Sequence, residues 1–468
     1  MNLTGIIIGI CVTFAAMSVV GVYTMKKIKS SEDFTLGGRN ASPIMIAGVI
    51  VGACVGSGGT IGTAQMAFSR GIVGWWQTLG VSIGCLILGI GLANVIYKMR
   101  VETAPQLLEK NFGSLIRPVT AIFSSIAIFL SILSQTRGFL PLLTSMVPVS
   151  LQIAASICVI LVLLFVLFGG FFATSMGGLL KIFLVLGSLL LSGIIAVVAF
   201  GGLGAMRGSF DYDPWFNMFS RGVSNDLAIG LGFVLGVLVT QTYIQAILSA
   251  KDPKAARKGA IIAACFTMPV GLFGTAVGLY MRQYFPSIDP AEAFPRFMIE
   301  TFNPVVAGIF IGGLMLATLG SNAGLIFGVA TMLSRDVYKK ARKAAKDKEM
   351  LVVMRALIVV ITVASGVFAV TRAGVLIQTF IFLSFGLRTC VFLVPMMFAF
   401  FYKGRMTKAA GLASVLAGPI TNIYWNLAKP IENVDAIYAG LVAAFLAFVI
   451  ANEIAKRMRR PEPLPVKT

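Results

Sequence analysis

The chain has 468 residues, of which 57% are hydrophobic and only 12% are charged, and its mean hydropathy is +0.92. Apolar runs of about 20 residues recur from end to end, so this composition excludes an ordinary soluble domain and predicts a polytopic helical membrane protein. The net charge of +20 would suit a nucleic-acid partner, but the basic residues lie in short segments between apolar runs, where they act as topology signals.

Several catalytic chemistries are excluded by what the sequence lacks. There is no histidine, so metal sites and proton relays built on histidine are ruled out. The six cysteines fall inside apolar runs without C-x-x-C spacing, which is typical of small core residues. The G-x-x-x-x-G-K-[ST] phosphate loop is absent, and we expect neither an enzyme nor a cofactor.

The first apolar run, residues 3–25, has no preceding positive charge and no A-x-A cleavage signal, so it predicts an uncleaved anchor helix. The second run, residues 43–72, contains GACVGSGGTIG with five glycines. Because glycine is a poor helix former, this pattern indicates a broken membrane helix, and such breaks carry solute sites in many transporters. Close helix packing through small residues explains the glycines equally well. The residues placed in a solute site here are Gly56, Ser57, Gly58 and Gly59.

Apolar runs and loops predict thirteen membrane spans, numbered 0 to 12. With the N-terminus outside, the inner loops hold 27 lysines and arginines and the outer loops hold 7. This bias predicts a plasma (inner) membrane protein with an outer N-terminus and a cytoplasmic C-terminus, whose partners are the lipid bilayer and a small solute, with no obligate protein partner evident. The expected spans cover 4–25, 44–68, 73–98, 117–144, 150–168, 172–200, 226–249, 256–281, 304–333, 351–370, 375–401, 407–425 and 434–456.

Four segments carry a resemblance. They are SEDFTLGGRNASP (31–43), QTYIQAILSAKDPKAARKGA (241–260), LGSNAGLIFGVATMLSRDVYKK (319–340) and GLRTCVFLVPMMFAFFYKGRMTKAAGLASVLAG (386–418). Together they resemble the sodium/solute symporter family, which includes bacterial proline and galactose symporters. The resemblance implies an all-α LeuT-type fold with two inverted five-helix repeats, in which helix 1 breaks near Gly56–Gly59 and helix 6 near Gly236–Val239. The implied parts are an extra helix with its inner loop (1–42), a first repeat (43–202), an outer loop (203–224), a second repeat (225–401) and two helices with a basic tail (402–468).

The resemblance also implies a coupling-ion site. Backbone carbonyls of Gly52 and Val55 on helix 1 and of Ala317 on helix 8, with two adjacent hydroxyls on helix 8 and a nearby aspartate on helix 5, would hold Na⁺. Ser321 keeps one hydroxyl, but Gly320 stands where the other is expected and Gly178 stands where the aspartate is expected. Na⁺ at Gly52, Val55, Ala317 and Ser321 is therefore one of two interpretations.

The other interpretation rests on Lys181, one turn beyond Gly178 on the same helix face. A lysine in mid-membrane costs at least ~2.5 kcal/mol, and its ammonium could donate to the carbonyls that otherwise hold sodium. This favours Na⁺-independent or proton-coupled transport, while ordinary Na⁺ symport stays open. Alternatively, helix 5 starts late and Lys181 extends to the inner surface.

Arg137 in helix 3 and Arg388 in helix 10 are buried cations, and no acidic residue lies deep in any predicted span. An anionic solute such as a carboxylate would neutralise one of them, although both arginines could instead bond helix-end carbonyls. Gln77, Gln241 and Tyr243 would extend the solute cavity, whereas Gly58 and Gly59 replace polar residues that bind sugar in the galactose symporter. We expect an alternating-access symporter for a carboxylate or amino-acid-like solute; a solute sensor or a channel is the remote alternative.

Overall fold

The structure is a computed structural model that describes residues 2–25, 39–99, 101, 103–175, 178–372, 374–402 and 406–458, without the side chains of 17, 19–25, 167–175 and 178–182. These residues form helices and one isolated bridge, between Ala41 and Ala250. In the first half the helices are α1 (Leu3–Met25), α3 (Pro43–Cys54), η2 (Gly58–Gly62), α4 (Thr63–Arg70), η3 (Gly71–Trp75), α5 (Trp76–Ile87), η4 (Leu88–Leu92), α6 (Ala93–Lys98), α7 (Ala104–Phe112), α8 (Ile116–Thr144), α9 (Leu151–Ser175), α10 (Gly178–Ala199), α11 (Leu203–Gly208) and α12 (Tyr212–Trp215).

The second half contains α13 (Val223–Val239), α14 (Gln241–Leu248), α15 (Pro253–Tyr284), η5 (Pro290–Glu292), α16 (Ala293–Thr301), α17 (Pro304–Met332), η6 (Leu333–Tyr338), α18 (Lys339–Ala341), α19 (Asp347–Thr371), α20 (Ile377–Phe401), α21 (Lys408–Ala428) and α22 (Ala436–Met458).

Helix starts follow a simple local rule: a capping side chain comes directly before a proline. Ser42, Asp252 and Asn303 each accept a hydrogen bond from a first-turn amide, and each precedes the proline that opens α3, α15 or α17. Proline suits this position because its missing amide would have no partner in the helix. These caps explain why the sequence locates the starts of long spans well.

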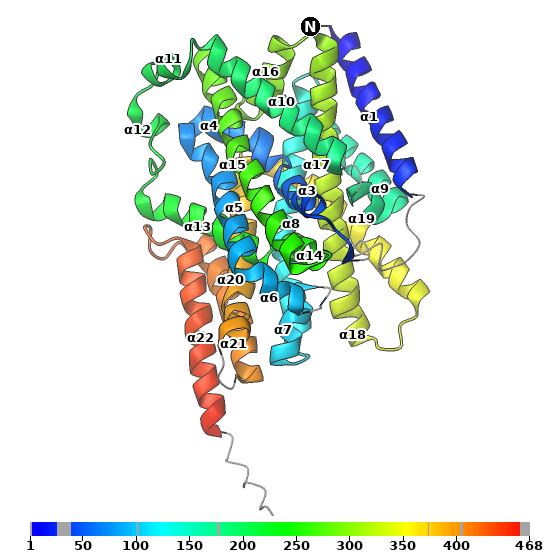
Figure 1. Ribbon diagram of the computed structural model, residues 1–468, viewed down its shortest axis with the longest axis vertical. Coiled ribbons are helices and arrows are strands. Elements are labelled where there is room, and N and C mark those ends of the chain that lie inside the picture. The colour runs from blue at the N-terminus through cyan, green and yellow to red at the C-terminus, as the bar shows by residue number, and fades with distance from the viewer. Residues whose placement is uncertain are drawn as a thin grey trace, which may run out of the picture.

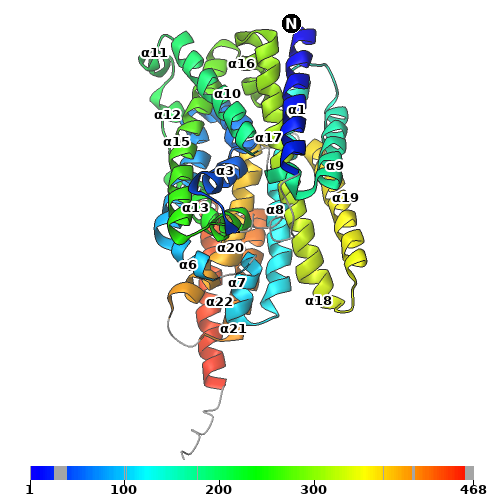
Figure 2. The same cartoon turned by 45° about the vertical axis from the view of Figure 1, so that its right-hand side comes forward.

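Most helices pack in two groups of neighbours. In one group α15 packs against α3, α4 and α5, and α5 packs against α13; in the other, α8 packs against α17 and α20, while α17 also contacts α1 and α9. Figures 1 and 2 show α1 along the edge beside α17, and α21 and α22 extending together from the opposite end of the molecule.

The described residues contain seven helices that are long and apolar enough to cross a membrane, or eight if the bent pair α13 and α14 counts as one span. Shorter apolar helices include α3 and described parts of α1, α9 and α10. The fold is thus an all-α polytopic membrane bundle as expected, and the count of thirteen spans remains a prediction.

The expected break in helix 1 is confirmed. α3 ends at Cys54, Val55 has φ −85° and ψ 54°, and helical geometry resumes in η2, a π-helical turn that begins at Gly58. Residues 55–57 therefore separate two half-helices. The freed backbone groups lie in the protein interior, because every residue from Cys54 to Phe68 is buried.

Helix 6 is also broken, but one residue later than predicted. Thr240 has extended backbone geometry (φ −75°, ψ 123°), and α13 and α14 meet there at 42°. The Thr240 hydroxyl donates to the Gly236 carbonyl at 2.7 Å. The glycines before the break serve packing instead: a Cβ on Gly230, Gly232 or Gly236 would lie 2.5–2.8 Å from Trp76, Phe382 or Phe385.

Glycine also sets the contact of α15 with α4. A Cβ on Gly278 would lie 2.4 Å from the Ala64 carbonyl oxygen, which belongs to the backbone and cannot rotate away. We expect Gly278→Ala to destabilise the protein by about 1–3 kcal/mol, because the two helices must separate. The measurement is thermal unfolding of the purified protein in detergent. Gly187→Ala is the control, since nothing lies within 4 Å of its Cβ position; equal stability of both variants would contradict the packing argument.

Candidate functional site

A small cavity lies where the two helix breaks approach one another. Its volume is about 40 Å³, enough for about three water molecules, and its lining comes from α3, α5, α8, α14, α17 and α20 together with Thr240 at the helix 6 break. The cavity is closed towards α4, where helix 1 is fully buried, whereas Gly52, Ala53 and Thr242 on its other side are partly exposed. Thr240 at the helix 6 break lines the cavity, and so does Cys54, the last residue of α3 before the helix 1 break.

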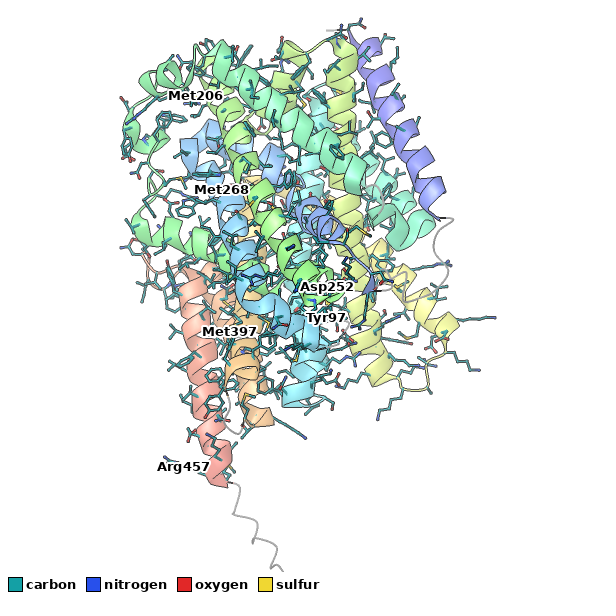
Figure 3. All side chains as sticks on the ribbon, viewed as in Figure 1. Tyr97, Met206, Asp252, Met268, Met397 and Arg457 are labelled. Carbon is teal, nitrogen blue, oxygen red and sulfur yellow. The ribbon has the colours of Figure 1, made fainter. Side chains whose placement is uncertain are left out.

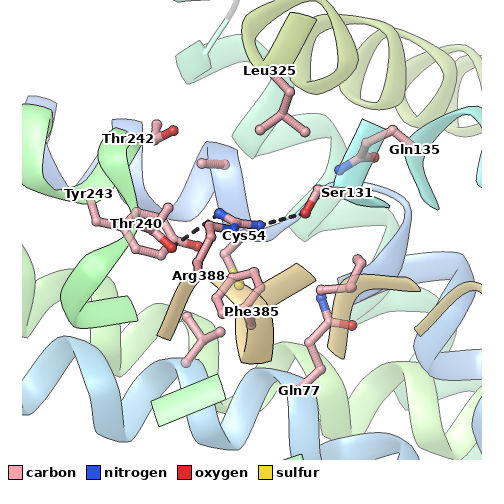
Figure 4. A pocket seen from close by; sticks show the side chains of 13 residues that line it. Cys54, Gln77, Ser131, Gln135, Thr240, Thr242, Tyr243, Leu325, Phe385 and Arg388 are labelled. Atoms are coloured by element: carbon pink, nitrogen blue, oxygen red, sulfur yellow. Dashed lines mark hydrogen bonds between the residues drawn. The ribbon is translucent and has the colours of Figure 1, made fainter. Parts of the chain in front are cut away.

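Arg388 projects from α20 into this cavity and is only 3% exposed (Figure 4). Its Nη2 donates to the hydroxyls of Ser131 and Ser384, both at 2.6 Å, and its Nη1 donates to the Thr240 hydroxyl at 3.2 Å. Its Nε donates to the Ser384 carbonyl at 3.2 Å, and the guanidinium lies 4.6 Å from the centre of the Phe385 ring. The guanidinium is therefore held rigidly by its neighbours.

All of these partners are uncharged. Among the described residues the buried acidic side chains are Asp226 and Asp336, and they pair with Arg221 and Arg117 at helix ends. Within the part of the chain that the structure describes, a cation therefore lies beside the cavity without a carboxylate to balance it. Since a buried unpaired charge costs several kcal/mol, such an arrangement suits a site for an anionic group.

The break of helix 1 is fixed by two glutamines. Gln135 of α8 accepts from the Ser57 amide at 2.9 Å and from the Ser57 hydroxyl at 2.8 Å. In the orientation of its amide that matches donors to acceptors, Gln77 donates to the Gly58 carbonyl at 3.0 Å and accepts from the Gly59 amide at 3.3 Å. Of the predicted solute residues on these helices, Gln77 lines the cavity, whereas Gly56, Ser57, Gly58 and Gly59 do not; Ser57, Gly58 and Gly59 are instead bonded to Gln135 and Gln77, which do.

A second pair of glutamines, Gln65 and Gln378, holds the helices together on the α4 side of the cavity. The Gln378 side chain donates to the Thr63 hydroxyl at 3.1 Å and to the Gly74 carbonyl at 3.0 Å, and Gln65 accepts from the Ile377 amide at 2.9 Å. Both glutamines are 4% exposed. These bonds join α20 to helix 1 and η3, and we call them the glutamine latch.

We expect Gln378→Leu to open the α4 side of the cavity, because the latch loses two hydrogen bonds worth about 1 kcal/mol each. The rate at which a membrane-impermeant thiol reagent added on the α4 side labels Cys54, a cavity residue, should then rise about tenfold. The exposed Cys11 and Cys265 are replaced by serine in all proteins tested. Gln283→Leu, at an exposed position, is the control, and an unchanged labelling rate in Gln378→Leu would contradict a gating role.

The residues expected at the ion site are partly brought together. The Ser321 hydroxyl of α17 donates to the Gly52 carbonyl of α3 at 3.3 Å. The two helices predicted to form the ion site, helix 8 and the first half of helix 1, therefore meet where the site is expected. Val55 is the first non-helical residue of the break, and Ala317 and Gly320 are buried on α17. Gly178 is the first residue of α10, and the Lys181 side chain lies outside the described residues.

Two other predicted residues, Arg137 and Gln241, lie away from the cavity, whereas Tyr243 lines it. Arg137 donates to the carbonyls of Ala369 and Val375, each at 3.3 Å, around the end of α19, and it does not line the cavity. Gln241 accepts from the Ala104 amide at 2.7 Å, while Tyr243 lines the cavity and is buried. Arg137 therefore has the contacts expected if it bonds helix-end carbonyls instead of a solute.

Sequence reasoning missed four polar residues of the site: Ser131, Gln135, Thr240 and Ser384. Each is a small or neutral side chain inside an apolar span, where such residues also serve ordinary helix packing. One signal was available, since Ser384 lies four residues before Arg388 and Ser131 lies four before Gln135, so each pair shares a helix face.

Comparison with known proteins decides the family. A family model described as "Sodium:solute symporter family" matches residues 34–418, most of the chain. The chain belongs to the sodium:solute symporter family. The symporter is 26% identical to the osmoregulated proline transporter OpuE of Bacillus subtilis (strain 168), over 97% of this chain and 95% of that protein. It is also 26% identical to the high-affinity proline transporter PutP of the same organism, over 92% and 94%.

Solved structures agree on the fold. The symporter is similar to a Na⁺-coupled sialic acid symporter in a substrate-bound outward-open state, with a TM-score of 0.73, 19% identity and 99% of both chains covered. It is also similar to MhsT in complex with L-phenylalanine, with a TM-score of 0.56, 14% identity and coverage of 88% of this chain and 98% of that one. The symporter is thus a membrane transporter with the expected LeuT-type fold, and not an enzyme.

Proposed function

We propose that this cation-coupled symporter carries a small organic solute with a carboxylate group, an amino-acid-like anion or zwitterion, and that Arg388 binds the carboxylate. The observation that carries the proposal is a buried guanidinium beside the cavity with only neutral hydrogen-bond partners in the described part of the chain. A carboxylate would supply the missing negative charge. Four of the five guanidinium N–H groups already donate within the site, so the carboxylate would accept from the remaining Nη1 hydrogen or displace one of the hydroxyl partners. The relatives named as proline transporters support a solute of this class.

The remainder of the cavity suits the apolar body of such a solute. Val81, Ile381 and Phe385 contribute apolar surface, and Gln77 and Thr242 contribute polar groups at its edge. At about 40 Å³ the cavity is smaller than an amino acid, so binding requires the two helix groups to move apart. The glutamine latch on one side and the partly exposed residues on the other support access that alternates between the two faces of the membrane.

For the coupling ion we favour proton coupling, or Na⁺ independence, through Lys181. A Cβ on Gly313 would lie 3.1 Å from Leu184 Cβ, and α10 and α17 run in opposite directions (Figures 1 and 2). Lys181 lies one turn before Leu184 on α10, and Ala317, which belongs to the expected ion site, lies one turn after Gly313 on α17, which supports the proposal that the two residues approach one another. Ordinary Na⁺ symport through the carbonyls of Gly52, Val55 and Ala317 and the Ser321 hydroxyl is the alternative, favoured by the contact of Ser321 with Gly52.

The experiment is uptake into vesicles that contain the purified protein, with Na⁺ and pH gradients varied separately. Radiolabelled proline is the first probe, and other monocarboxylates compete against it. We expect carboxylates to compete and the matching neutral amides to fail, because an amide cannot balance Arg388. Equal competition by amides and carboxylates would overturn the assignment of Arg388 to the solute.

A further inference from the structure

One strongly charged surface is unrelated to the cavity. It is the turn that joins α17 to α19, residues 335–348, which we call the basic turn. Its acidic neighbours are largely occupied: Asp336 pairs with Arg117 of α8 at 2.6 Å, and Glu349 pairs with Arg342 at 3.2 Å. Apart from the residues of these two ion pairs, residues 335–348 contain six basic residues and one acidic residue, Asp347. The basic residues of the turn are Arg335, Lys339, Lys340, Arg342, Lys343, Lys346 and Lys348.

The turn has a defined shape. Tyr338 donates through its hydroxyl to Glu349, which closes the turn, and the Lys339 ammonium donates to the Ala345 carbonyl. Ala345 is buried at the centre of the turn, while Lys343, Lys346 and Lys348 around it are exposed. The three lysines are therefore exposed on a short loop whose shape is set by these two hydrogen bonds.

The position of the turn relates it to lipid. Figures 1 and 2 both place α18 and the start of α19 at the outer edge of the molecule, and Figure 3 shows long side chains extending from this edge. α19 exposes apolar side chains along its length, including Val352, Val360 and Val367 at 58–65% exposure. In a membrane span such a face contacts lipid hydrocarbon. Val352 is four residues, about 6 Å of helix, after Lys348, so the lysines lie at the depth of the lipid headgroups.

We propose that the basic turn binds the phosphate headgroups of anionic phospholipids in the leaflet that it meets. Clustered lysines next to a lipid-facing helix attract anionic headgroups, and each contributes about fivefold to the association at low salt. If these lysines served only to set the orientation of the protein in the membrane, their number alone would matter and their arrangement would not. In this turn the lysines instead lie on a closed loop beside a lipid-facing surface.

The test uses the full chain in phosphatidylcholine vesicles that contain a trace of spin-labelled lipid. The quantity measured is the preference of the protein for spin-labelled phosphatidylglycerol over spin-labelled phosphatidylcholine. For the wild type we expect a preference that declines as salt is raised. For the variant Lys343→Gln, Lys346→Gln, Lys348→Gln we expect the preference to fall by at least about fivefold, with helicity and monodispersity unchanged because the three side chains are exposed.

Two controls make the result specific. Replacing the same three lysines by arginine keeps the charge and should keep the preference. Replacing Lys254, Arg257 and Lys258 by glutamine removes the same charge from another exposed basic segment, at the start of α15, and should change the preference little. The proposal is overturned if the wild type shows no salt-dependent preference, if the glutamine variant of the turn keeps it, or if the α15 control loses as much.

Discussion

Replacement of Arg388 by lysine should raise the solute concentration needed for half-maximal uptake by at least about tenfold. The guanidinium donates to three hydroxyls and one carbonyl in fixed geometry, and a lysine ammonium, with three donors and no planar fork, cannot keep those four bonds and also donate to a carboxylate. Arg388→Ala should lose uptake of carboxylates almost completely, because a carboxylate in the cavity would then be buried without a partner. The measurement is initial uptake rate against solute concentration in vesicles.

Arg137→Lys is the matched control. Arg137 is 6% exposed and donates to backbone carbonyls near the end of α19, away from the cavity, so its replacement should lower thermal stability while leaving the half-maximal solute concentration within about twofold. If Arg388→Lys leaves solute affinity unchanged and Arg137→Lys lowers it, the two arginines must exchange the roles proposed for them. If neither changes it, both arginines are structural.

The second large effect is expected at Lys181. Transport should persist without Na⁺ and depend on pH, and Lys181→Ala should abolish the dependence of uptake on the proton gradient. The reason is electrostatic: two like charges about 4 Å apart repel by roughly 4 kcal/mol at an effective dielectric constant near 20, so a protonated Lys181 and Na⁺ exclude one another at the same carbonyls. The measurement is the initial rate of uptake with each gradient imposed alone.

Three results would contradict proton coupling through Lys181. The first is uptake that requires Na⁺ and saturates with it in the wild type. The second is a proton dependence that survives in Lys181→Ala. The third is rapid reaction of Lys181 with an amine reagent from the aqueous phase, because a lysine at the inner surface could not occupy the ion site. The first or the third would restore Na⁺ coupling through Gly52, Val55, Ala317 and Ser321, and the second would assign the proton coupling to another residue.

The sequence predicted the backbone of this fold well because the governing signals are local. Most long spans were placed to within a few residues, since caps such as Asp252 with Pro253 mark helix starts and apolar runs mark their length. The helix 1 break was also placed close to its observed position at residues 55–57, because five glycines lie between residues 52 and 62. The helix 6 break was misplaced by one residue, because Gly230, Gly232 and Gly236 are there to admit aromatic rings, and the chain bends at Thr240 instead.

The site was less predictable because its contacts join residues far apart in the chain. Gln135 meets Ser57 and Gln378 meets Thr63, over separations of 78 and 315 residues. No local pattern distinguishes a glutamine that fixes a helix break from one that faces water. Arg388 was found from the sequence because a charge within an apolar span is conspicuous by itself, but its three hydroxyl partners appear only in the structure.

The unbalanced positive charge around the cavity has a consequence for electrical currents. With Arg388 beside the cavity and the buried carboxylates near helix ends already paired, any charge that crosses the membrane must belong to the solute and its coupling ion. A monovalent anion carried with one proton moves no net charge, so the membrane potential would neither drive nor oppose it. A zwitterion carried with one Na⁺ moves one positive charge, for which each 100 mV supplies about 2.3 kcal/mol. The same guanidinium would thus serve an electrically silent symport or a symport driven by the membrane potential, according to the coupling ion.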